Sequence, residues 1–160
     1  MKAMFNKPIV RFLVFLIANF LALYIGVILM NNGPKTDWYI SLNKAPWTPP
    51  NWLFGVAWTS IMLFFSIYMT RLSFKTREFN RKLLFLYTLQ WLLNVSWNYI
   101  FFNQHKTFLG LAVIVALWLL IGYFTLKYYK TLRWYTLFII PYLIWMTIAT
   151  SLNAYIVINN

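Results

Sequence analysis

The sequence predicts an all-α membrane protein, in which five transmembrane helices form one bundle and residues 1–160 form a single domain. Composition is the first reason. Hydrophobic residues make up 62% of the chain and the mean hydropathy is +0.64, whereas an average globular chain is roughly half apolar. The second reason is that the two acidic residues, Asp37 and Glu78, both lie outside the long apolar runs.

Each of five apolar runs is long enough to cross a bilayer core, which takes about 20 residues in a helix. The expected helices cover residues 9–30, 52–70, 83–102, 107–126 and 134–158. These runs are too long for the strands of a membrane barrel, and backbone groups in lipid must be satisfied within the chain. The prediction is therefore a helical bundle.

The first run has a competing interpretation, a cleaved signal peptide. Basic residues precede it, but the run 9–30 is longer than the apolar core of a signal peptide, which has about 7–15 residues. No small-residue cleavage motif follows the run. We therefore expect a retained first helix.

Basic residues lie between the runs with a strong bias. Eleven lie on the N-terminal side, in the N-terminal segment and in the predicted connectors 71–82 and 127–133. Three lie on the other side, in the loop 31–51 and the turn 103–106. The positive-inside rule then places the N-terminus inside and the C-terminus outside, with the long loop 31–51 facing outward. Because the turn 103–106 is tight, the third and fourth helices should be antiparallel neighbours.

The composition also excludes several classes of function. A formal charge of +12 would suggest nucleic acid in a soluble chain, but here the basic residues flank apolar runs, which indicates anionic lipid headgroups. Without cysteine, the chain has no disulfide, thiol chemistry or thiolate metal site. The parts of a carboxylate pair or a serine triad are missing, and no ionisable residue lies deep in a run, which disfavours ion-coupled transport.

His105 is the only histidine and lies in the turn between the third and fourth helices. We expect a solvated or interfacial turn residue. The alternative, a haem axial ligand, would require the ring to reach a pocket, and its place in the turn argues against that.

Amides and aromatic rings are the functional groups that the helices do carry. Helical spacing puts two sets of residues on one face each, Gln90, Asn94 and Trp97 on the third helix and Trp145, Ala149 and Asn153 on the fifth. Amides in lipid need partners, so they should point into the bundle. The tryptophans on these faces would then line an internal cavity. Alternatively, the tryptophans near helix ends are interfacial anchors and nothing more.

Two pairs of small residues predict close helix packing, and one proline predicts a bend. The pairs Gly55 with Thr59 and Ala112 with Ala116 allow close helix approach, either within one chain or in a dimer. Pro141 should remove a helical hydrogen bond within the fifth run and bend it, which would tilt Trp145.

Residues 38–59 hold four of the nine tryptophans and three of the six prolines. Pro46, Pro49 and Pro50 cannot lie inside a regular helix, and each pushes the preceding residue toward an extended conformation. We therefore expect a stiff, aromatic loop that leads into the second helix at Trp52 and folds over the mouth of the bundle.

The pattern W-Y-x-x-L-x-K-x-P-W-T-P-P-x-W-x-F-G-x-x-W-T in this stretch resembles the signature of the TspO/MBR family, the tryptophan-rich sensory proteins related to the mitochondrial translocator protein. Two further motifs follow in the family's order. Residues 90–102 resemble Q-x-x-L-N-x-x-W-S-x-x-F-F, with Asn98 in place of the usual Ser. Residues 141–153 resemble P-Y-x-x-W-x-x-F-A-x-x-L-N, with Ile148 where Phe is commoner.

The resemblance implies a five-helix receptor or sensor that binds porphyrins, such as protoporphyrin IX, among the helices under the first long loop. Isoquinoline carboxamide and benzodiazepine drugs are implied ligands of the same pocket. The family's pocket positions fall on Tyr39, Pro49, Trp58, Asn94, Trp97, Trp145 and Ala149. The protein itself is expected to hold no metal and no cofactor, with the porphyrin as ligand or substrate.

Some family members are reported to degrade porphyrin in light and oxygen, and tryptophans matching Trp58 and Trp145 are implicated. Porphyrin degradation in the same pocket and tetrapyrrole transport therefore stay open beside binding. The family's sterol-recognition pattern is missing after Tyr155, so a sterol is a weak candidate ligand. The resemblance also implies a homodimer. The positive-inside pattern without a transit peptide favours a bacterial plasma membrane.

Overall fold

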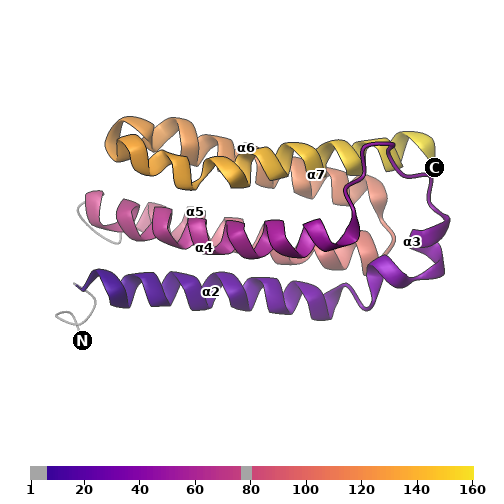
Figure 1. Cartoon of the computed structure of the whole chain (residues 1–160), viewed down its shortest axis with the longest axis horizontal. Helices are drawn as coiled ribbons and strands as arrows, with labels where there is room; N and C mark the ends of the chain where they lie inside the picture. Colours follow the sequence, from indigo (N-terminus) through magenta and orange to yellow (C-terminus); the bar gives the residue numbers. More distant parts are fainter. Residues whose placement is uncertain (1–6, 77–80) are drawn as a thin grey trace.

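A computed structural model describes residues 7–76 and 81–160. Its five long helices run side by side in one bundle, as Figure 1 shows: α2 (Pro8–Leu29), α4 (Asn51–Lys75), α5 (Arg81–Asn98), α6 (Thr107–Leu132) and α7 (Ile140–Asn159). No strand occurs in the described residues. The predicted all-helical architecture is confirmed. Every long helix except α5 is long and apolar enough to cross a membrane by length and composition alone.

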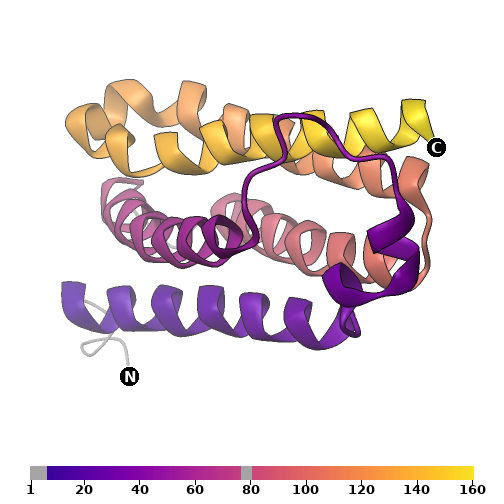
Figure 2. The ribbon, with the colours of Figure 1, turned by 45° about the vertical axis from the view of Figure 1, so that its right-hand side comes forward.

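The helices surround a common core. α2 packs against both α4 and α5, while α6 and α7 pack together on the other side of that pair (Figure 2). α5 and α6 are neighbours joined by a short turn, and they run in opposite directions, as predicted. The start of α2 lies at one end of the bundle, whereas the loop after α2 and the C-terminus lie at the other end (Figure 1).

Two helices extend further than the sequence predicted. α4 ends at Lys75 and α6 at Leu132, although the apolar runs end near residues 70 and 126. The basic residues of these stretches therefore lie on helical turns, and the predicted connectors 71–82 and 127–133 are too long; residues 77–80 lie outside the described part. Lysine and arginine are good helix formers, and their long side chains carry the charge beyond the apolar zone.

The fifth predicted helix begins later than expected. A short 3₁₀ helix, η3 (Arg133–Phe138), precedes α7, and Pro141 lies in the first turn of α7. Proline is tolerated there because the first helical N–H groups have no intrahelical acceptor. The predicted bend at Pro141 is therefore wrong, since no hydrogen bond of the helix interior is lost.

Aromatic rings fill the centre of the bundle. Phe65 on α4 is fully buried, and its ring centroid lies 5.3 Å from that of Tyr142, 6.2 Å from that of Tyr87 and 6.3 Å from that of Phe124. These partners belong to α7, α5 and α6, so one side chain contacts three other helices. Such ring pairs add to the free energy that area burial alone supplies.

A buried polar cluster joins α2, α4 and α5. Asn19 on α2 donates from Nδ2 to the Ser66 hydroxyl at 2.9 Å, and its Oδ1 accepts from the Tyr87 hydroxyl at 2.7 Å. Ser66 in turn donates to the Met62 carbonyl at 2.6 Å. In lipid such groups have no water to bond, so the cluster fixes the three helices in register.

We predict that Tyr87→Phe destabilises the protein, because the Asn19 Oδ1 atom then stays buried without a donor. The expected cost is about 1 kcal/mol, or about 2–4 °C in Tm. Thermal unfolding in detergent, followed by circular dichroism, measures it. Tyr24→Phe is the matched control, since Tyr24 lies on α2 with 64% of its surface exposed. Equal shifts in the two variants would contradict the role of the cluster.

Candidate ligand-binding cavity

The long loop after α2 contains two short helices that the sequence interpretation missed. They are η1 (Gly33–Lys35) and α3 (Asp37–Ser41). Thr36 caps α3, because its hydroxyl accepts from the Tyr39 N–H at 3.3 Å, and Asp37 lies in the first turn. The threonine and aspartate at this point were the sequence signal that predicts a helix start.

Contacts on one side hold the loop against the end of α5. The Trp38 ring stacks on that of His105, with centroids 4.1 Å apart and planes 12° apart, and the Tyr39 ring packs 5.2 Å from that of Phe102. His105 is exposed in the turn before α6, as expected, and lies outside the cavity walls. Its added role is to support Trp38.

Hydrogen bonds on the other side hold the loop against α7. The Trp47 indole N–H donates to the Ser151 hydroxyl at 3.1 Å, and the Asn43 N–H donates to Asn160 Oδ1 at 2.8 Å. The loop therefore crosses the end of the bundle from α5 to α7, as the expectation of a loop over the mouth requires.

The end of α5 departs from α-helical geometry. Residues Tyr99–Asn103 form a π-helical turn, η2, which the sequence did not predict. Phe101 and Phe102 are both buried there, and the Phe101 ring stacks on that of Trp97 with centroids 5.2 Å apart. Wider turns of this kind are frequent at functional sites.

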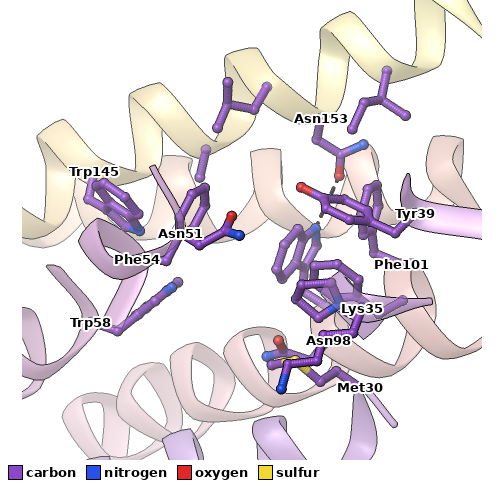
Figure 3. Close-up of a pocket in the computed structure, with 16 residues that line it drawn as sticks. Met30, Lys35, Tyr39, Asn51, Phe54, Trp58, Asn98, Phe101, Trp145 and Asn153 are labelled. Atoms are coloured by element: carbon purple, nitrogen blue, oxygen red, sulfur yellow. Dashed lines mark hydrogen bonds between the residues drawn. The ribbon is translucent and has the colours of Figure 1, made fainter. Parts of the chain in front are cut away.

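A cavity of about 260 Å³ lies beneath the loop (Figure 3). Its walls come from the end of α2, from the loop, from the first turns of α4, from the end of α5 and from α7. The lining residues are Met30, Pro34, Lys35, Tyr39, Asn51, Phe54, Trp58, Trp97, Asn98, Phe101, Phe102, Trp145, Ala149, Leu152, Asn153 and Ile156.

Five of the seven predicted pocket residues line this cavity, namely Tyr39, Trp58, Trp97, Trp145 and Ala149. Pro49 and Asn94 do not. Pro49 precedes the extended residue Pro50 that caps α4, and the following Asn51 forms the wall. The periodic pattern did not single out Lys35, Phe54 or Met30, because they come from loop and helix ends whose direction the tertiary structure sets.

Asn94 instead lies behind the cavity wall and acts on it through Tyr142. The side-chain amides of Gln90 and Asn94 both donate to the Tyr142 hydroxyl, at 2.8 and 3.0 Å. The Tyr142 ring in turn packs edge-on against Trp58, with centroids 6.1 Å apart. Both amides are buried, which confirms the expectation that they point into the bundle.

The polar groups of the wall differ in whether they already have partners. The Trp97 indole N–H donates to Asn153 Oδ1 at 3.1 Å, shown as a dashed line in Figure 3, and Asn153 Nδ2 donates to the Thr107 carbonyl at 3.1 Å. By contrast, Trp145 is 6% exposed and its Nε1–H has no hydrogen-bond partner. A buried donor without an acceptor costs free energy, so a ligand acceptor beside Trp145 would recover it.

Among its described residues, the cavity wall carries one positive charge and no acidic residue. Lys35 is the one charged residue among the lining residues. Burial raises the pKa of the Tyr39 hydroxyl above its usual value, so this group adds no negative charge to the cavity. The cavity therefore suits a flat aromatic molecule that is neutral or carries a carboxylate near Lys35.

Comparison with known proteins identifies the same family as the sequence motifs. The sequence profile of the TspO/MBR family matches residues 13–158. The chain is 39% identical over 119 residues to Protein CrtK of Rhodobacter capsulatus, covering 72% of this chain and 74% of that protein. It is 34% identical over 117 residues to the tryptophan-rich sensory protein of Cereibacter sphaeroides, covering 73% of each. It is 29% identical over 126 residues to the human translocator protein, covering 76% of this chain and 74% of that protein.

We predict that Gly33→Ala loosens the loop. A Cβ atom there would lie 2.5 Å from Phe102 Cγ and 2.6 Å from Phe102 Cβ, close to the backbone of η2, so the loop must shift. Trypsin should then cleave after Lys35 and Lys44 several-fold faster, which mass spectrometry measures. Gly55→Ala is the control, because no atom lies within 4 Å of the added Cβ. Unchanged cleavage in Gly33→Ala would show that the contact with Phe102 does not hold the loop.

Proposed function

Because the chain belongs to the TspO/MBR family and is an integral, multi-pass membrane protein, we propose that it is a receptor or sensor that binds a tetrapyrrole such as protoporphyrin IX. The proposed site is the cavity beneath the loop. The observation that carries the proposal is the convergence there of Tyr39, Trp58, Trp97 and Trp145 from the loop, α4, α5 and α7.

The chemistry of the walls matches such a ligand. Tetrapyrroles are planar, and aromatic rings bind planar ligands through their faces and edges. Ala149 leaves space between the rings, and Lys35 offers a positive charge to a carboxylate. The Trp145 Nε1–H supplies a donor that the protein itself does not satisfy. Drugs of the isoquinoline carboxamide and benzodiazepine type, with aromatic rings and a carbonyl acceptor, fit the same description.

The size of the cavity adds a requirement. Its volume of about 260 Å³ is smaller than that of most ligand pockets, which enclose about 300–1,000 Å³. A tetrapyrrole is larger than this space, so the loop must move outward when it binds. Only side-chain contacts and a few hydrogen bonds hold residues 38–47, which makes that movement feasible.

The arrangement of charge supports the predicted orientation. The described basic residues of the N-terminal segment, the end of α4, the start of α5 and the α6–α7 junction lie at one end of the bundle, and Lys35, Lys44 and Lys106 lie at the other (Figure 1). We propose that α5 also spans, with the N-terminus inside, the C-terminus outside and a bacterial plasma membrane as the location. A homodimer is part of the proposal, because Gly55, Thr59, Ala112 and Ala116 are exposed on the single chain.

A second candidate function is light- and oxygen-dependent degradation of the bound porphyrin. The specific observation is that Trp58 and Trp145 lie in the same wall of the cavity, where their indoles would be next to an excited porphyrin (Figure 3). Molecular oxygen would be the oxidant and the porphyrin the photosensitiser. No carboxylate pair or serine triad is needed for such a reaction.

The proposal predicts that protoporphyrin IX quenches tryptophan fluorescence saturably, at one site, in the dark. Trp145→Phe should weaken binding about tenfold, because it removes the free donor and part of the ring surface. Ala149→Leu should weaken it further by filling the cavity. Trp134→Phe is the control, since Trp134 is 60% exposed and lies in η3, at the other end of the bundle.

The same titration under illumination in air separates the two functions. A new absorbing product that forms with repeated turnover, at a rate that Trp58→Phe lowers more than its effect on dark affinity explains, would favour degradation. Unsaturable quenching, or equal affinity in all variants that retain their helical circular dichroism, would contradict the binding site.

A further inference from the structure

A groove lies on the outside of the bundle, at the end far from the loop. It is an open depression of about 350 Å³ between α2 and α4, lined by Pro8, Ile9, Phe12, Ile67, Thr70 and Arg71. Apart from Arg71 the walls are mainly apolar, and the Thr70 hydroxyl already donates to the Ser66 carbonyl at 2.7 Å. Ile9 is 59% exposed, so the groove opens toward the surroundings of the bundle, which in a membrane are lipid acyl chains.

The end of the bundle that holds this groove is strongly basic. Within residues 7–76 and 81–160 it carries Lys7, Arg11, Arg71, Lys75, Arg81, Lys82, Lys127, Lys130 and Arg133. The one acidic residue of that part of the chain, Asp37, lies on α3 at the opposite end (Figure 1). Clusters of this kind beside apolar helices attract anionic lipid headgroups.

Arg71 is the cation that borders the groove. Its guanidinium carbon lies 4.6 Å from the centroid of the Tyr135 ring, so the aromatic face supports it. Among the described residues Arg71 forms no hydrogen bond and no ion pair, which leaves its N–H groups for a ligand. Arg11 differs, because it donates to the Ser73 carbonyl at 2.8 Å and to the Ser73 hydroxyl at 3.2 Å.

We propose that this groove is a binding site for one anionic phospholipid of the surrounding leaflet. One acyl chain lies along Ile9, Phe12 and Ile67, and the phosphate accepts hydrogen bonds from Arg71. Guanidinium groups bind phosphate oxygens in a two-point geometry that ammonium groups cannot reproduce. The site does not involve the cavity under the loop, so it stands independently of the tetrapyrrole proposal.

Charge decides between lipid and a second copy of the chain as the occupant. A second copy in the groove would bring another set of the same cations to this end, with no acidic residue from the described part to offset them. An anionic phospholipid neutralises the excess charge and fills the apolar groove at once. A zwitterionic lipid fills the groove but leaves the charge.

Native mass spectrometry of the full-length protein in detergent tests the proposal. The protein is titrated with phosphatidylglycerol and, separately, with phosphatidylcholine of the same acyl chains. We expect one phosphatidylglycerol to bind more tightly than phosphatidylcholine, and Arg71→Gln to weaken its binding about fivefold. Ile9→Trp, which fills the groove without changing charge, should also lower phosphatidylglycerol occupancy.

Lys75→Gln is the matched control, because it removes the same charge one turn later on α4, outside the groove. It should change the affinity less than twofold. Equal affinity for the two lipids, or equal losses in Arg71→Gln and Lys75→Gln, would overturn the site in favour of nonspecific surface attraction. A lipid-independent dimer that Ile9→Trp disrupts would instead identify the groove as an interface between copies.

Discussion

Every polar group inside a bilayer core needs a partner within the chain, because lipid offers none. In this protein α5 supplies hydrogen-bond donors to two other helices, α2 and α7. Tyr87 and Trp91 donate to Asn19 and to the Ala18 carbonyl on α2, at 2.7 and 2.9 Å. Gln90 and Asn94, and then Trp97 one turn further along, donate to side chains of α7. The least apolar of the five long helices therefore connects α2 to α7 through hydrogen bonds.

The cavity follows from this arrangement. Trp97 is the last residue of α5 whose side chain donates to another helix, and beyond it the π-helical turn η2 buries Phe101 and Phe102. The loop then closes over them through Tyr39, so the rings form walls with space between them. Among the residues that line the cavity, Trp145 has a buried indole N–H without a hydrogen-bond partner. A buried donor left unsatisfied beside a cavity is the kind of departure that functional sites show.

The number and type of the long helices followed from the apolar runs, because their length and lack of charge leave few alternatives. Periodicity also predicted the inward amides, since polar groups in lipid must turn toward protein. The helix ends at Lys75 and Leu132 did not follow, because a basic residue is compatible with both a helical turn and a loop. Pro141 was misplaced for a related reason, since a proline fits the first turn of a helix as well as a bend.

The site was partly predictable. Helix spacing and the motifs pointed to Trp58, Trp97, Trp145 and Ala149, which lie on regular helices whose faces the sequence determines. The motif positions Pro49 and Asn94 lie outside the cavity wall. Pro49 lies just before the start of α4, and Asn94 donates a hydrogen bond to Tyr142. Lys35, Asn51 and the two phenylalanines of η2 line the cavity only because of how the loop and the π-helical turn pack. No local pattern specifies those contacts.

Hydrogen exchange with and without protoporphyrin IX in the dark, read by mass spectrometry, shows whether the cavity under the loop binds the ligand. The cavity described above predicts changed exchange in residues 33–58 and in the part of α7 from Trp145 onward, as the loop moves and the walls engage the ligand. The start of α2 and the junction between α6 and α7 should keep their exchange rates. Saturable binding with changes confined to the start of α2 and the α6–α7 junction, or with no change in the loop, would show that the ligand binds outside this cavity.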